Sequence, residues 1–208
     1  YKDLWTDFRT TDCRPDGKVW DMYSSITHYV FGTDQNTGGG GREGADYNRE
    51  HSMPKSWFHD GYPMYTDLFH LYPTDSYINS MRSNYPFGEV GTVSKQSSGG
   101  FSKLGKSAVP GYSGTVFEPA DEYKGDFART YFYMVTRYEA QVAGWSSDML
   151  SGDAYPAFTD WALEVLLKWH RQDPVSDKEV DRNNAVYGIQ HNRNPYIDFS
   201  TFYFTLQH

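Results

Sequence analysis

The spacing of apolar positions changes several times along the chain, and each change predicts a different element. From Asp3 toward Tyr23 the pattern predicts an N-terminal helix that is interrupted by a turn at Pro15-Asp16-Gly17. Residues 27–31 and 46–51 are typical of strands, and the glycines at 38–41 form a flexible loop between them. Residues 68–71 are short and apolar, which favours a second strand.

The remaining segments favour helices. One is predicted to begin after Pro73, with Thr74 or Asp75 as its N-cap, and to end near Ser83. Residues 93–114 are rich in Gly, Ser and Lys and predict an exposed hairpin or loop, and residues 192–198 predict a turn. Three longer helices are predicted at 121 or 125 to about 139, at 156–171, and from a capping box at 176–179 to about 190. Helices with a few short antiparallel strands indicate an α+β fold, in a single domain over 1–208.

Composition limits the possible classes of protein. The chain has 208 residues, of which 38% are hydrophobic and 22% charged, so it is globular rather than disordered. The net charge of −8 argues against general electrostatic capture of nucleic acid, but a local basic cleft or a bound cation is compatible with it. The single cysteine, Cys13, excludes an intramolecular disulfide, and no apolar run is long enough to span a membrane.

The most informative motif is Asn48-Arg49-Glu50-His51-Ser52. Glu50 could hold a hard cation, His51 could take a proton from water, and Arg49 could meet an anion. The predicted helix at 75–83 adds Asn79 and Arg82, which share one face of that helix. Mg²⁺ takes oxygen ligands and keeps several waters, so it needs only one or two protein ligands, which Glu50 and Asn79 could provide. This set predicts metal-assisted attack on a phosphodiester with His51 as the general base.

Each of these residues also has a structural interpretation. An isolated histidine is more often a hydrogen-bonded structural residue, and the neighbours of His51 are what favour a catalytic role. His70 lies in an apolar stretch, so we expect it in the core or supporting the site rather than binding metal. Arg129 lies within an aromatic-rich helix, where a buried ion pair and a catalytic contact to phosphate or leaving group are equally supported. Lys55 and Arg82 are further candidates for substrate binding.

Competing chemistries lack their motifs. The histidines show no H-E-x-x-H spacing, no G-x-S-x-G stretch is present, and the glycines at 38–41 are not followed by Lys-Ser or Lys-Thr. Zinc hydrolysis, a serine hydrolase and a phosphate-binding loop are therefore not supported.

Several motifs in order resemble the bacterial endonuclease I family, over nearly the whole chain. They are Asp16 to Ser24, Asn48 to Phe58, Asp67 to Pro73 with Asn79 and Arg82-Ser83-Asn84, Val116 to Pro119, Lys124 to Arg129, and Asn192 to Pro195. The resemblance implies a ββα-metal (His-Me finger) motif, one Mg²⁺ bound by Glu50 and Asn79 with Mn²⁺ or Ca²⁺ as alternatives, and His51 as general base. It also implies a secreted or periplasmic nuclease that cuts DNA and often RNA with little sequence preference. Departure of a metal-held 3′-oxygen would give 5′-phosphate products. Because the chain starts at Tyr1 without a methionine, we expect that a leader has been removed, and we expect a monomer.

The sequence departs from that family in two respects. Some members carry a phosphate-clamping arginine between the catalytic histidine and the second strand, where residues 54–66 offer only Lys55. The role is therefore vacant or moves to Lys55, Arg82 or Arg129. Some members are rich in disulfides, which this chain cannot form.

A second functional hypothesis is a secreted glycan-binding module without catalysis. Aromatic residues make up 18% of the chain, and an aromatic surface could stack on sugars. This hypothesis leaves the ordered motifs around Glu50, His51 and Asn79 unexplained.

Overall fold

The computed structural model describes residues 1–199 and confirms an α+β fold. Its helices are α1 (Leu4–Thr11), α2 (Ser76–Arg82), α3 (Lys124–Arg137), α4 (Glu139–Val142), α5 (Asp160–Gln172), α6 (Asp177–Gln190) and α7 (Pro195–Asp198). Its strands are β1 (Tyr47–His51), β2 (Leu71–Asp75), β3 (Val90–Gln96), β4 (Lys103–Ser107) and β5 (Thr115–Glu118). None of the helices in 1–199 combines the length and the apolar character that crossing a membrane requires.

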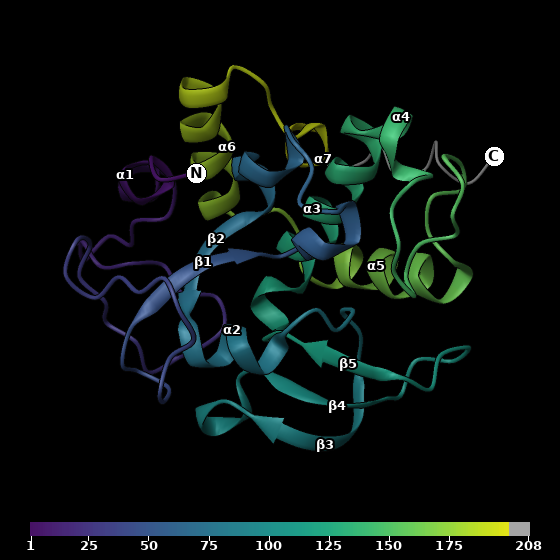
Figure 1. The fold of residues 1–208 in the computed structure, drawn as a ribbon, viewed down its shortest axis with the longest axis horizontal. Helices are drawn as coiled ribbons and strands as arrows, with labels where there is room; N and C mark the ends of the chain where they lie inside the picture. The colour runs from purple at the N-terminus through teal and green to yellow at the C-terminus, as the bar shows by residue number, and fades with distance from the viewer. Residues whose placement is uncertain (200–208) are drawn as a thin grey trace.

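Two antiparallel sheets lie on either side of α2. β1 pairs with β2 so that Glu50 is opposite Tyr72 and His51 is opposite Leu71. The second sheet has the order β3-β4-β5 and contains the hairpin expected in residues 93–114. Figure 1 shows the β1-β2-α2 unit between this second sheet, at the bottom of the view, and the helices α6 and α7 at the top.

The core is built on rings, as the aromatic content suggests. α3 is buried from Lys124 to Met134 and packs against α5. Phe87 contacts the rings of Phe117, Phe127 and Tyr131, which joins the second sheet to α3.

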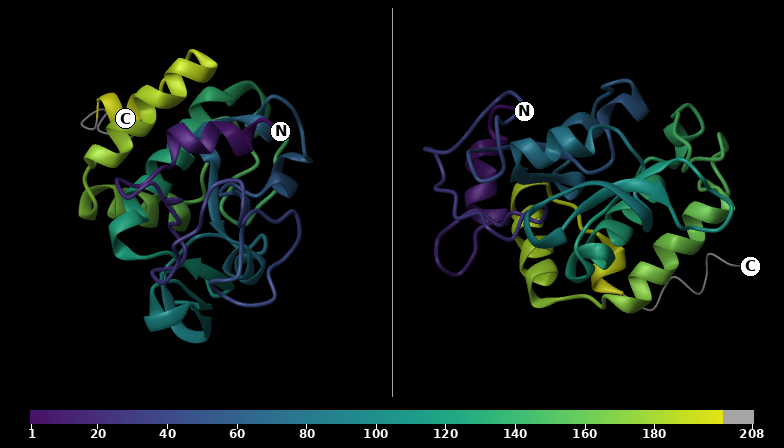
Figure 2. Two further views of the ribbon diagram at one scale, coloured as in Figure 1. Left: turned by 90° about the vertical axis from the view of Figure 1, so that its left-hand side faces the viewer. Right: turned by 90° about the horizontal axis from the view of Figure 1, so that it is seen from below.

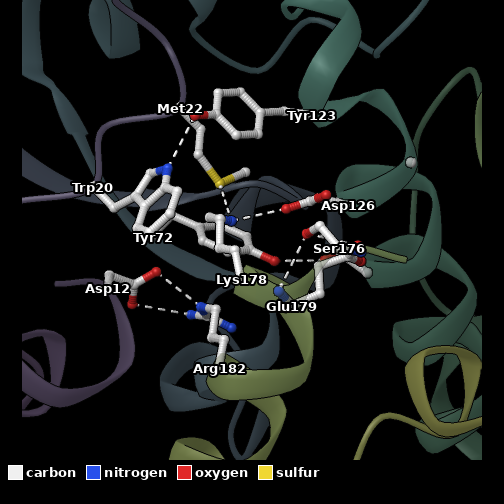
Figure 3. Close-up of polar contacts among 12 residues, drawn as sticks. Asp12, Trp20, Met22, Tyr72, Tyr123, Asp126, Ser176, Lys178, Glu179 and Arg182 are labelled. Atoms are coloured by element: carbon white, nitrogen blue, oxygen red, sulfur yellow. Dashed lines mark hydrogen bonds and ion pairs between the residues drawn. The ribbon is translucent and has the colours of Figure 1, made fainter. Parts of the chain in front are cut away.

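Buried ion pairs fasten the helices to the β1-β2 unit (Figure 3). Arg182 on α6 donates to Asp12, which follows α1, and to the carbonyl oxygens of Leu68 and Leu71 around the start of β2. Lys178 on α6 donates to Asp126 on α3 at 2.8 Å. These contacts hold α1 against α6, as the left view of Figure 2 shows.

The second strand of the β1-β2 pair begins later than the sequence predicts. Residues 68–70 form a 3-10 turn because the Asp67 side chain accepts a hydrogen bond from the backbone N–H of Phe69. β2 then runs over Leu71–Asp75 and includes Pro73, opposite Arg49. Proline is tolerated there because a two-stranded sheet leaves one edge of each strand without ladder partners.

Two other predictions, the end of the N-terminal helix and a strand at 27–31, were wrong. The N-terminal helix ends at Thr11, and the chain up to Tyr23 is irregular. Residues 27–31 are not a strand, since this segment is held by separate contacts such as the hydrogen bond from Val19 N–H to the carbonyl oxygen of Tyr29. The predicted helices are present with shifted starts, α5 beginning at Asp160, and the predicted turn at 192–198 contains the short helix α7 capped by Asn194.

Candidate active site

The helix α2 carries Asn79 and Arg82 because its start is fixed by Asp75. The Asp75 carboxylate accepts from the backbone N–H of Ile78, as expected of an N-cap, and also from the Tyr29 hydroxyl and the Gly44 N–H. The register of β1 and α2 then places Asn79 and Arg82 beside Asn48 and Glu50, about 30 residues earlier in the chain. Strand and helix therefore bring the two predicted metal ligands together.

Glu50 is buried, and its Oε1 atom accepts two hydrogen bonds. The donors are the Tyr23 hydroxyl and the Arg82 guanidinium, each at 2.9 Å. Burial raises the pKa of Glu50 to about 7, and the charges and hydrogen bonds of Arg82, Tyr23 and Asn79 oppose this shift. The Glu50 carboxylate has thus lost water, and the protein offsets only part of the cost of burying its charge. This arrangement favours a cation as a further partner.

Asn79 is oriented by a neighbour on β1. Its Nδ2 atom donates to Oδ1 of Asn48 at 2.7 Å, and Nδ2 of Asn48 donates to the carbonyl oxygen of Gly38. One carboxylate and one amide oxygen are a donor set suited to a hard cation that keeps several waters. In residues 1–199 no group of three or more His, Cys, Asp or Glu side chains could hold a metal, so a cation here would rely on these two ligands.

His51 is the last residue of β1, and its ring is fixed in one orientation. Nε2 donates to the carbonyl oxygen of Tyr65 at 3.0 Å, which leaves Nδ1 as the acceptor nitrogen of the neutral ring. Burial, with His70 contributing, lowers the pKa of His51 to about 3, so the ring is neutral near pH 7. Neutral imidazole with one nitrogen free to accept is the form that a general base requires.

Aromatic rings enclose this histidine. Tyr1 stacks on it with ring centroids 5.8 Å apart, and the Tyr65 ring lies at 5.0 Å. His70 lies 5.3 Å away, fully buried, with Nε2 donating to the carbonyl oxygen of Met64. His70 thus supports His51 from the core side, as expected from its apolar surroundings.

The predicted basic residues differ in what they can reach. Arg49 lies over the rings of Tyr1 and Trp5 and donates to the Tyr1 carbonyl oxygen, and it stays partly exposed. Lys55 is about half exposed and pairs with Asp60 at 2.5 Å. Both charges act on His51, which places them near its ring. Arg49 and Lys55 therefore remain the accessible candidates for a phosphate contact.

Arg82, which the sequence predicts to bind substrate, lies in the interior of the protein. It is fully buried and donates to Glu50, to the carbonyl oxygens of His51 and Ser52, and to the Tyr131 hydroxyl. A guanidinium enclosed in this way does not reach substrate. These contacts fix the position of Glu50 and of the end of β1, and they argue for a positioning role rather than a phosphate contact.

Arg129, predicted either to form a buried ion pair or to contact phosphate, also lies in the interior. It is fully buried, and its guanidinium forms a bidentate pair with Glu179 on α6 at 2.5 and 2.7 Å. Its Nη1 atom donates to the carbonyl oxygen of Asp173 and lies 3.2 Å from Nδ1 of His170. The structure shows the buried ion pair, which is one of the two interpretations of Arg129. We therefore favour a structural role for Arg129 over a catalytic one.

The sequence model of the family described as Endonuclease I matches residues 1–201. The chain belongs to the endonuclease I family. This agrees with the order of motifs from Asp16 to Pro195 and with the β1-β2-α2 unit around Glu50, His51 and Asn79.

Several known nucleases are similar to the chain. It is 36% identical over 213 residues to the extracellular ribonuclease of Bacillus amyloliquefaciens, a match that covers 95% of this chain and 65% of that protein. The extracellular ribonuclease of Bacillus subtilis is 35% identical over 203 residues with the same coverage. The periplasmic deoxyribonuclease of Aeromonas hydrophila is 26% identical over 132 residues, covering 64% of this chain and 47% of that protein. The chain therefore spans about 65% of the length of the two Bacillus relatives.

Three residues of this endonuclease I site were missed by sequence reasoning. Tyr23 donates to Glu50, Asn48 accepts from Asn79, and Tyr65 accepts from His51 through its backbone. Tyr23 and Asn48 lie inside motifs that carry the family resemblance, which was a usable signal. The role of the Tyr65 carbonyl depends on chain folding alone, so no side-chain pattern indicates it.

Proposed function

We propose that the chain is a divalent-metal-dependent nuclease that hydrolyses phosphodiester bonds of DNA and RNA with little sequence preference. One observation carries this proposal: Glu50, buried beside Asn79, directly precedes a neutral histidine whose Nε2 is occupied by a backbone carbonyl. Relatives named as ribonucleases and as a deoxyribonuclease support both kinds of nucleic acid as substrates. Because these relatives are extracellular or periplasmic, we also propose that the protein is exported.

The residues divide the chemistry between them. Glu50 and Asn79 would hold Mg²⁺, or Mn²⁺ or Ca²⁺ in its place, and the cation would neutralise charge on the phosphate and leaving oxygen. Nδ1 of His51 accepts a proton from the attacking water, and Tyr65 keeps the ring in the required tautomer. The bond between phosphorus and the 3′-oxygen breaks, so the products carry a 3′-hydroxyl and a 5′-phosphate.

The phosphate itself needs cationic partners outside this pair. Arg49 and Lys55 lie near His51 and are the accessible cations of the proposed site. Arg82 orients Glu50, so its effect on catalysis is indirect.

The decisive assay is digestion of plasmid DNA and of RNA by the purified protein with Mg²⁺, Mn²⁺, Ca²⁺ or EDTA, followed by analysis of the product ends. Cleavage that EDTA abolishes, with 5′-phosphate ends, supports the proposal. His28→Ala is a matched control for His51→Ala because His28 is exposed. Absence of cleavage with every cation, combined with retention on a polysaccharide column, would instead support a glycan-binding module.

A further inference from the structure

The second sheet carries an uneven distribution of charge. The whole chain has 27 acidic and 19 basic residues, yet residues 90–117 contain Lys95, Lys103 and Lys106 and neither Asp nor Glu. These three side chains lie on the β3-β4 hairpin, which we call the lysine hairpin. Lys95 and Lys106 lie on one face of this sheet, because Lys95 is opposite Leu104 and side chains alternate along β4, and Lys103 lies on the other face.

Lys95 and Lys106 have no carboxylate partner among residues 1–199, whereas Lys103 lies opposite Glu118 on β5 and its charge acts on Asp121. Lys55, Lys124, Lys168 and Lys178 all form ion pairs with carboxylates, whereas across residues 1–199 none of the three hairpin lysines does. Lys95 and Lys106 are exposed, and Lys103 is half-buried. Unpaired ammonium groups in water keep their attraction for a polyanion, at a range of about 10 Å at moderate salt.

One end of the lysine hairpin is fastened beside the proposed metal site. Ser102, next to Lys103, donates from its hydroxyl to the carbonyl oxygen of Tyr23 at 2.8 Å. The Tyr23 hydroxyl in turn donates to Glu50. The turn between β3 and β4 is held further by Glu43, which accepts from the backbone and side chain of Ser98. Ser102 and Tyr23 therefore connect this end of the hairpin to Glu50.

An open groove lies beside β5, the strand next to the lysine hairpin. Lys106 lies opposite Thr115 in the β4-β5 register, and Thr115 lines a groove of about 720 Å³. Ser56, which follows His51 by five positions, and Asn84, which follows Arg82 by two, line the same groove. The segments that leave β1 and α2 thus meet β5 at this groove, which none of the hairpin lysines lines, and Figure 1 shows the sheet bordering α2 along the lower edge of the molecule.

We propose that the lysine hairpin binds the phosphate backbone of a polynucleotide outside the bond that is cut. The inference rests on the proposed nuclease function and deepens it. Ammonium groups contact phosphates without reading base edges, so this surface adds affinity for long chains and no sequence preference. It also explains how a protein with a net charge of −8 retains a polyanionic substrate.

Binding measured without catalysis tests this surface. The native protein and a Lys95→Gln/Lys103→Gln/Lys106→Gln variant are titrated into a fluorescent single-stranded oligonucleotide in EDTA, between about 50 and 200 mM NaCl. We expect the variant to bind about tenfold or more weakly at low salt, and the slope of log affinity against log salt to shrink by about 0.7 for each phosphate that the variant no longer binds. Lys18→Gln/Arg137→Gln/Arg171→Gln changes the charge equally at sites outside the hairpin and should retain the native slope.

Each result decides the proposal. Equal affinity and slope in the native protein and the hairpin variant, or no oligonucleotide binding by the native protein, would overturn it. Since Lys103 is half-buried, Lys95→Glu/Lys106→Glu provides a second variant at exposed positions, and it should bind more weakly still. Native protein that binds in EDTA but does not cleave with Mg²⁺ would refute the nuclease function alone, whereas cleavage with an unchanged salt slope in the variant would refute the lysine hairpin alone.

Discussion

Nε2 of His51 lies 3.0 Å from the carbonyl oxygen of Tyr65. A backbone carbonyl can only accept a hydrogen bond, so this contact assigns the proton of the neutral ring to Nε2 and the lone pair to Nδ1. The tautomer of the proposed general base is thus determined by main-chain geometry, which side-chain substitution at position 65 leaves in place.

Replacing His51 should therefore slow the chemical step and leave the binding of metal and substrate largely unchanged. His51→Ala is expected to lower kcat by about 10²- to 10⁴-fold, the usual contribution of general-base catalysis. Affinity for Mg²⁺ should change little, because Glu50 and Asn79 remain. Steady-state kinetics at saturating DNA and cation measure the effect, and a His51→Ala protein that keeps most of its kcat would exclude His51 as the base.

Removal of a metal ligand should be visible in stability as well as in activity. A ligand present at 100 times its Kd stabilises the folded state by about 2.7 kcal/mol, so Mg²⁺ should raise the Tm of the native protein. Asn79→Ala should lose much of that Mg²⁺-dependent rise, whereas Ser80→Ala, at an exposed neighbouring position on α2, should keep it. An equal rise in all three proteins would show that the cation binds elsewhere.

Arg82→Met should destabilise the fold. It leaves Glu50 buried without its cation and removes donors to the carbonyl oxygens of His51 and Ser52. Breaking a buried pair from one side costs about 3–5 kcal/mol, to be measured by urea unfolding. If Arg82→Met instead kept native stability and only weakened DNA binding, Arg82 would be a substrate contact.

Arg129→Met should separate stability from catalysis. Loss of the pair with Glu179 is expected to cost about 3–5 kcal/mol, because the Glu179 carboxylate stays buried between α3 and α6. Assayed well below its Tm, the variant should keep the KM and kcat of the native enzyme. A fall in kcat of the folded variant would restore Arg129 as a catalytic candidate.

Asp21 predicts a dependence of stability on pH. It is buried, accepts from Tyr23 N–H and the Thr27 hydroxyl, and burial raises its pKa to about 7. A carboxyl group whose pKa is raised by folding stabilises the fold most below about pH 4. That contribution is lost as the pH rises toward 7, because the unfolded chain then releases a proton that the folded protein still holds. The free energy of unfolding of the native protein should therefore fall between pH 5 and pH 8 by more than that of Asp21→Asn. Parallel pH profiles for the two proteins would contradict this assignment.

The sequence predicted those parts of the fold that depend on local contacts. The capping box at Ser176 and Glu179 is present in both directions, and Asp75 caps α2, because these hydrogen bonds join residues three apart. β2 was misplaced because all of Leu71–Asp75 is buried, which removes the alternation that marks a strand. The buried ion pairs of Arg129 and Arg82 were not predicted, because their partners Glu179 and Glu50 lie 50 and 32 residues away, where no sequence pattern indicates a pair.

The separation of charge between the lysine hairpin and the rest of the surface has a practical consequence for purification. With a pI near 5.3, the protein should bind an anion-exchange resin at neutral pH through its acidic faces. Lys95 and Lys106 are exposed, and a resin that attracts carboxylates leaves them available to nucleic acid from the lysate. Preparations made at low ionic strength should therefore carry host oligonucleotides, visible as excess absorbance at short ultraviolet wavelengths, until a high-salt wash releases them.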